Sequence, residues 1–231
     1  MKALITFTFI SLISFSAFAE NSIYVEQTED DNLNLKIHQE GDNNIVDMYD
    51  TSSYIEGVDM HLHQHNVLNN SLTNKIELWH IDSGNSIKWG QGASTCITCT
   101  SFTTDVNDDD IGGQYALIDI HGTGNNIAGT QMNAGDGSHS SQLYIWSDNN
   151  DIVIKQKNDD DKSLVLYTHN DDNDVSITQR NSASHSATIS LDGSHGTSLS
   201  LTQRGNTSQS YSLSQNCQTN GGCSVSVTQG N

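Results

Sequence analysis

One short pattern recurs along this chain at a nearly constant spacing: an apolar residue, any residue, an apolar residue, any residue, then glutamine. The strings of this form end at Gln39, Gln64, Gln156, Gln179, Gln203 and Gln229. The first pair and the last four recur with a period of roughly 24 residues, which has room for two short strands and two turns. Alternate side chains of a β-strand point to the same face, so the two apolar residues and the glutamine share one face.

Weaker alternating strings lie half-way between the glutamine strings. With both kinds of string counted, successive strands are expected to start at Leu164, Val175, Ala187, Leu199 and Tyr211, with a half-period of about 12 residues between neighbours. Clusters of Gly, Asn, Asp and Ser such as Asp148-Asn149-Asn150 separate them, and these residues favour turns. We predict an all-β fold, a β-solenoid of stacked strand-turn-strand coils, following an N-terminal signal peptide.

Four regions are expected along the chain. Residues 1–19 have the form of a secretory signal peptide, with Lys2, an apolar middle and the exit Ala17-Phe18-Ala19. Residues 20–91 hold divergent repeats, and residues 92–113 interrupt the rhythm as an insertion. Residues 114–231 hold the more regular repeats.

The charge is strongly negative and unevenly placed. Loss of Lys2 with the leader takes the formal net charge from −19 to −20. Such a balance argues against nucleic acid and anionic membranes as partners. Residues 175–231 carry only Asp192, Arg180 and Arg204, so this nearly neutral tract can stack on copies of itself with little repulsion. The chain has no proline, which suits segments that pair on both sides.

The recurring strings resemble the curlin repeat of bacterial curli fimbriae, roughly Ser-x5-Gln-x-Gly-x-x-Asn. Residues 39–44, Gln-Glu-Gly-Asp-Asn-Asn, match the Gln-x-Gly-x-x-Asn segment. Residues 64–69 match it with Asn in the place of Gly, and Gln203-Arg204-Gly205 matches its first half. The resemblance covers most of residues 33–231. It departs in the length, the acidity and the four cysteines.

The resemblance implies a secreted subunit of extracellular amyloid-like fibres at the cell surface, which serve adhesion and the biofilm matrix. Its expected partners are homologous subunits and the outer-membrane secretion machinery, with no small-molecule substrate and no cofactor. Two other classes stay open: a calcium-stabilised secreted β-roll adhesin domain, and a β-helix enzyme acting on polysaccharide. We expect no enzymatic activity, because no nucleophile elbow, metal-binding helix or phosphate-binding glycine loop is present in the sequence.

Stacked coils place equivalent side chains above one another about 4.8 Å apart. Buried amides can then donate and accept along the stack, which removes the penalty of burying them. The expected stacking ladder comprises Gln39, Asn44, Gln64, Asn69, Gln156, Gln179, Gln203 and Gln229.

The cysteines are candidates for disulfides in an oxidising compartment. Cys96 and Cys99 form a C-x-x-C, for which a disulfide or free thiols are favoured over a metal or redox role. Cys217 and Cys223 flank a turn, and a disulfide closing that turn is the preferred interpretation.

Two groups of potential metal ligands are interpreted as surface features. His61, His63 and His65 alternate along one strand and are taken as a solvated face, so no metal site is predicted. Acidic turns such as Asp108 to Asp110 and Asp159 to Asp161 do not match known calcium-loop spacings. We interpret them as charges that delay stacking, with weak calcium binding as the alternative.

Overall fold

The chain forms two long parallel β-sheets in the computed structural model. It describes residues 21–27, 33–40, 44–50, 58–65, 74–81, 85–92, 113–121, 124–132, 138–146, 149–157, 160–169, 172–180, 182, 184–194, 197–218 and 222–230. The strands are β1 (Asn21–Gln27), β2 (Leu33–Glu40), β3 (Asn44–Asp50), β4 (Val58–His65), β5 (Asn74–Ile81), β6 (Asn85–Gln91), β7 (Gln114–Ile120), β8 (Asn126–Met132), β9 (His139–Ile145), β10 (Asp151–Lys157), β11 (Lys162–Thr168), β12 (Asp174–Gln179), β13 (Ala187–Gly193), β14 (Ser198–Thr202), β15 (Ser212–Cys217) and β16 (Ser224–Val227).

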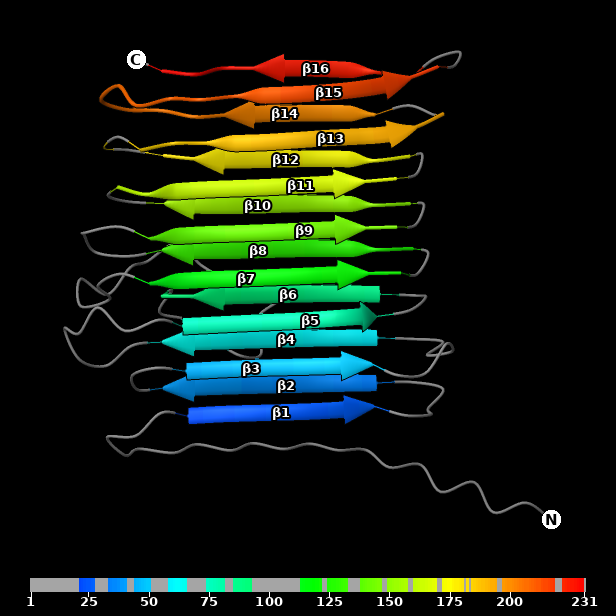
Figure 1. The fold of residues 1–231 in the computed structure, drawn as a ribbon, viewed down its shortest axis with the longest axis vertical. Helices are drawn as coiled ribbons and strands as arrows, with labels where there is room; N and C mark the ends of the chain where they lie inside the picture. Colours follow the sequence, from blue (N-terminus) through cyan, green and yellow to red (C-terminus); the bar gives the residue numbers. More distant parts are fainter. Residues whose placement is uncertain are drawn as a thin grey trace.

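Successive strands alternate between the two sheets. The eight odd-numbered strands form sheet A in sequence order, and the eight even-numbered strands form sheet B in the same way. Each coil therefore contributes one strand to each sheet. In Figure 1 the coils stack along the long axis of the molecule from β1 to β16, with the strands perpendicular to that axis. This arrangement confirms the predicted β-solenoid.

Equivalent residues of the repeats are in register across neighbouring coils. In sheet B, Ile152 pairs with Val175 and Gln156 pairs with Gln179. The pairing extends over the early coils, where Gln39 pairs with Gln64. A slip of one residue would turn every apolar side chain to the outside, so the alternating pattern fixes this register.

The core lies between the two sheets and runs the length of the stack. It is built from Ile, Leu, Val and Met side chains that alternate with outward-facing residues. One aromatic residue, Trp89, is fully buried among them. Its neighbour on the next coil of sheet B is Gly129. A Cβ atom at Gly129 would lie 2.0 Å from the Trp89 ring, so this glycine makes the space for the indole.

Several Asn and Asp residues lie in turns with a left-handed backbone conformation. Asn149 and Asp172 have φ angles of 58° and 59°, a left-handed region that these two residue types tolerate. The predicted signal peptide and nearly all of the 92–113 insertion lie outside the described residues. Within the described part of the chain there is no helix long and apolar enough to cross a bilayer.

Candidate assembly site: amide ladders and the open end coil

A continuous ladder of glutamine side chains lies inside the corner where sheet B passes to sheet A. Each amide nitrogen donates to the amide oxygen of the preceding coil. The bonds are Gln64 to Gln39 (2.8 Å), Gln91 to Gln64 (2.9 Å), Gln131 to Gln91 (2.8 Å), Gln156 to Gln131 (2.8 Å) and Gln179 to Gln156 (2.8 Å). All these glutamines are buried, so the ladder satisfies groups that would otherwise be costly to remove from water.

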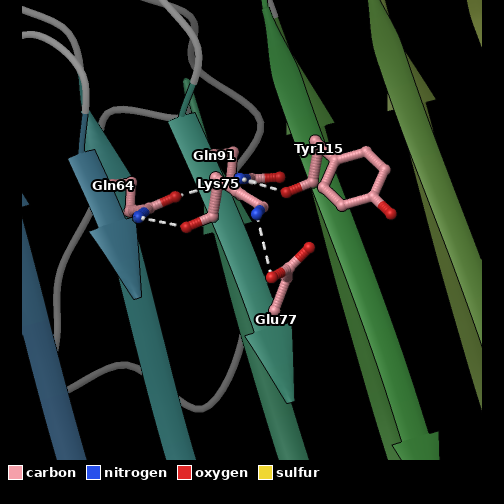
Figure 2. A network of polar contacts seen from close by, with 5 residues as sticks. All are labelled: Gln64, Lys75, Glu77, Gln91 and Tyr115. Carbon is pink, nitrogen blue, oxygen red and sulfur yellow. Dashed lines mark hydrogen bonds and ion pairs between the residues drawn. The ribbon is translucent and has the colours of Figure 1, made fainter. Parts of the chain in front are cut away.

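Each ladder glutamine also bonds to backbone at the start of the following strand of sheet A. Gln64 Nε2 donates to the carbonyl oxygen of Lys75 at 2.9 Å, and Gln91 Nε2 donates to that of Tyr115 at 3.0 Å. Figure 2 shows these bonds, together with the ion pair of Lys75 with Glu77 on the outer face. The same bond recurs from Gln156 to Ser163 and from Gln179 to Ser186. The glutamine side chain thus links the end of one strand to the start of the next by a hydrogen bond, whatever the length of the turn between them.

The direction of the ladder reverses near the C-terminal end. Gln203 Nε2 donates forward, to Gln229 Oε1 at 3.2 Å, and to the carbonyl oxygen of Ser210 at 2.6 Å. The Oε1 atoms of Gln179 and Gln203 consequently accept no hydrogen bond among the described residues. The final coil is therefore joined to the ladder by a weaker link than the interior coils.

Asparagine ladders occupy the other inner corners. Asn44 Nδ2 donates to Asn74 Oδ1 at 3.1 Å in sheet A. At the entry to sheet B, Asn125 donates to Asn85 at 2.8 Å, Asn150 bonds to Asn125, and Asn173 bonds to Asn150. Asn69, which the sequence placed in the ladder, lies outside the described residues.

The sheet A column that contains Asn44 and Asn74 becomes basic further along the stack. His139 pairs with Lys162 on the next coil, and all of His139, Lys162 and His185 are buried. Burial and then the charge of Lys162 lower the pKa of His139 to about 3. Nearby backbone carbonyl groups act in the opposite direction and raise this pKa by less. Burial also lowers the pKa of His185, whose Nδ1 lies 3.1 Å from the Ser208 carbonyl oxygen. The histidines are neutral at pH 7, which keeps a single strongly basic side chain in this column.

Aromatic side chains stack on the outer face of sheet A. The rings of Tyr144 and Tyr167 lie 5.4 Å apart at 9°, and those of Trp146 and His169 lie 4.3 Å apart at 10°. Trp146 Nε1 donates to Asp119 Oδ1 at 2.9 Å. The parallel register thus pairs side chains outside the solenoid as well as inside it.

The remaining candidates from the sequence are placed as follows. Cys217 and Cys223 form a disulfide across the turn between β15 and β16. Cys96 and Cys99 lie outside the described residues, as do the side chains of His63 and His65. His61 Nε2 lies 3.2 Å from Asp59 Oδ1. The described residues contain no cluster of three or more His, Cys, Asp or Glu that could hold a metal ion.

The C-terminal coil presents core positions to solvent. Val225 and Val227 are in register with Leu199 and Leu201 and continue the columns of the interior. They are 40% and 39% exposed, whereas Leu199 and Leu201 are 1% and 0% exposed. In the described part of the chain nothing covers the outer edges of β15 and β16, so their backbone groups are unpaired on that side.

Several ladder residues had a signal in the sequence that the repeat strings above did not include. Gln91 ends the string Ile87-Lys88-Trp89-Gly90-Gln91, which has the repeat pattern, and Gln131 ends one in which Gly129 replaces an apolar residue. The buried basic column had no comparable signal.

Comparisons with protein families, with characterised proteins and with solved structures found no match to this chain.

Proposed function

We propose that this chain is a structural subunit of an extracellular amyloid-like fibre, which grows when the first coil of one molecule stacks on the last coil of another. The observation that supports this most directly is the exposure of Val225 and Val227 at positions that are buried in every interior coil of sheet B. Exposed apolar residues beside an unpaired strand edge favour addition of another strand.

The first coil has the matching pattern. Leu35, Ile37 and Gln39 of β2 have the same spacing as Val225, Val227 and Gln229 at the other end. Stacking in register places Gln39 beside Gln229 and covers both valines. Ser226 then lies beside Lys36 on the outer face. The joint between molecules reproduces the parallel pairing found inside each one.

The wider role follows from the resemblance to curlin repeats. In this proposal the fibres serve cell adhesion and the biofilm matrix at the cell surface, and the subunit is exported through outer-membrane secretion machinery. It polymerises with homologous subunits and carries no catalytic activity.

The growth of fibres by residues 20–231 tests the proposal. We expect thioflavin-positive fibres with cross-β diffraction at about 4.8 Å along the fibre axis. Val227→Asp places a charge in the joint and should slow elongation at least about tenfold, since burying a valine contributes about 1.5–3 kcal/mol. Ser226→Asp is the control, because it adds the same charge on the outer face of the same strand.

Three outcomes would overturn the proposal. The first is a chain that stays monomeric when concentrated and seeded. The second is a monomer that folds only with calcium, which favours a β-roll domain, and the third is cleavage of a polysaccharide. Equal slowing by Val227→Asp and Ser226→Asp would show that growth does not use the inner face of β16.

A further inference from the structure

On the outward face of sheet B, the charged residues of the last four strands occupy particular positions along each strand. Each strand, together with the residues that directly follow it, offers four outward positions. They are Asp151, Val153, Lys155 and Lys157 from β10; Asp174, Ser176, Thr178 and Arg180 from β12; Ser198, Ser200, Thr202 and Arg204 from β14; and Ser224, Ser226, Thr228 and Gly230 from β16. Acidic residues stand only at the first of these positions, and arginines stand only at the last.

The basic column at the last position is unusual for so acidic a chain. Lys157, Arg180 and Arg204 follow the in-register ladder glutamines directly, so they lie on successive coils about 4.8 Å apart. Burial, followed by the charges of Lys155 and Arg180, lowers the pKa of Lys157. None of the ion pairs among the described residues involves this column. Like charges in register are destabilising, which calls for an anionic partner.

An acidic column lies at the opposite end of the same strands. Asp151 and Asp174 are in register and both are exposed. The distance along β10 from Asp151 to Lys157 is six residues, or about 20 Å. The face therefore has one acidic and one basic border, both parallel to the long axis of the stack.

We propose that this face pairs with the same face of a second copy of the chain, about a two-fold axis parallel to the solenoid axis. A half-turn about such an axis brings the two faces together and reverses the strand direction. Lys157 then meets the partner's Asp151 at the same height, and Arg180 meets the partner's Asp174. A two-fold axis along the strands would instead set basic column against basic column, so charge selects the first arrangement.

The centre of the face permits close approach. The second positions carry Val153, Ser176 and Ser200, and the third carry Lys155, Thr178 and Thr202. The two-fold axis sets these columns against each other. Except for Lys155 the side chains are small, which allows the two sheets to pack at about 10 Å as in paired cross-β sheets.

The contact area of this face is too small to hold two separate molecules together in solution. Four strands about 4.8 Å apart and seven residues long give a face of about 19 by 23 Å, or roughly 440 Å² per copy. Stable interfaces bury about 800 Å² per partner. Along a fibre the face recurs once per molecule, and the axes of the paired fibres stay parallel. The inference thus rests on the proposed function, and paired filaments are expected only after axial growth.

Charge reversal on one border tests this. The basic-border variant K157E/R180E/R204E should give single filaments, read as half the mass per length in electron microscopy, with thioflavin growth retained. The acidic-border variant D151K/D174K should likewise give single filaments with thioflavin growth retained. Combining both sets exchanges the borders and should restore paired filaments. Lys75→Glu and Asp192→Lys, on the outer face of sheet A, serve as controls of both signs and should leave pairing unchanged.

The outcomes separate this inference from the proposed function. The absence of thioflavin-positive growth by the wild-type chain would overturn the proposed function itself. Growth with unpaired wild-type filaments, or paired filaments in both single-border variants, overturns only the lateral pairing. A wild-type chain that stays single but binds dextran sulfate through the basic border, with loss in K157E/R180E/R204E, would assign that border to an anionic polymer instead.

Discussion

The side-chain nitrogen of Gln91 donates to the carbonyl oxygen of Tyr115 at 3.0 Å, across 24 residues of sequence. The equivalent bond from Gln156 to Ser163 spans 7 residues. The inner corner therefore has the same hydrogen bond whether the chain turns at once or detours through the 92–113 segment. The ladder tolerates insertions because the glutamine, rather than the turn, sets where the next strand of sheet A begins.

Replacing an interior ladder glutamine should be more costly than replacing the terminal one. Gln91→Met removes the hydrogen bonds that Gln91 donates to the buried Oε1 of Gln64 and to the part-buried carbonyl oxygen of Tyr115. Each such group costs about 1–3 kcal/mol, so we expect unfolding free energy to fall by about 3 kcal/mol. Gln229→Met, at the exposed end, should cost less than about 1 kcal/mol. Guanidinium unfolding followed by circular dichroism measures both, and equal losses would contradict the structural role of the buried ladder.

Gly129→Ala should destabilise the stack through its neighbour. The added methyl group meets the Trp89 ring, which is rigid and fully buried. Overpacking of this kind costs about 1–3 kcal/mol. The double variant Trp89→Leu with Gly129→Ala should recover part of that loss, whereas independent sites would give additive losses. A double-mutant cycle in guanidinium measures the coupling.

His139 should make the fold sensitive to acid. Its pKa is about 3 in the folded chain and 6.5 in the unfolded chain, so the unfolded state binds the proton more tightly. The stability contributed by the neutral imidazole is complete above about pH 6.5. It falls by about 1.4 kcal/mol per pH unit toward pH 3. Comparison of His139→Gln with wild type at several pH values isolates this slope, and identical slopes would refute the assignment.

Removing the neighbouring charge should shift that titration. Lys162 lowers the pKa of His139, so Lys162→Met should raise it. Acid destabilisation should still begin near pH 6.5 as the pH falls, but it should level off at a higher pH than in wild type. Lys155→Met, which removes an outward-facing charge on β10 of sheet B, is the control and should leave the His139 titration in place. Imidazole proton resonances report the pKa directly.

The Cys217–Cys223 disulfide should stabilise the final coil. It closes a loop with a sequence separation of 6, for which the chain-entropy estimate is about 2 kcal/mol. Cys217→Ser with Cys223→Ser should therefore raise amide exchange in β15 and β16 without changing it in β9 to β12. Exchange that rises evenly along the stack would show that the bond acts on the whole fold.

The repeat strings were sufficient to predict the strands, the inward-facing residues and the solenoid. Gln156 and Gln179 could be placed on one face because a strand alternates strictly, and their spacing set one coil. Gln91 was missed because the 92–113 insertion breaks the spacing after its intact string, and Gln131 was missed because Gly129 replaces an apolar residue. The reversal of the ladder at Gln203 had no signal, since the orientation of an amide depends on the groups around it.

The sequence by itself determined the period, the polarity of each strand face and the parallel register, because these follow from local alternation and from the matching of like residues. Only the tertiary structure decided which separate positions became neighbours. It buried Lys162 between two histidines and set Gly129 against Trp89 across the 92–113 segment. Those relationships depend on the number of residues in every intervening turn, which local sequence patterns do not fix.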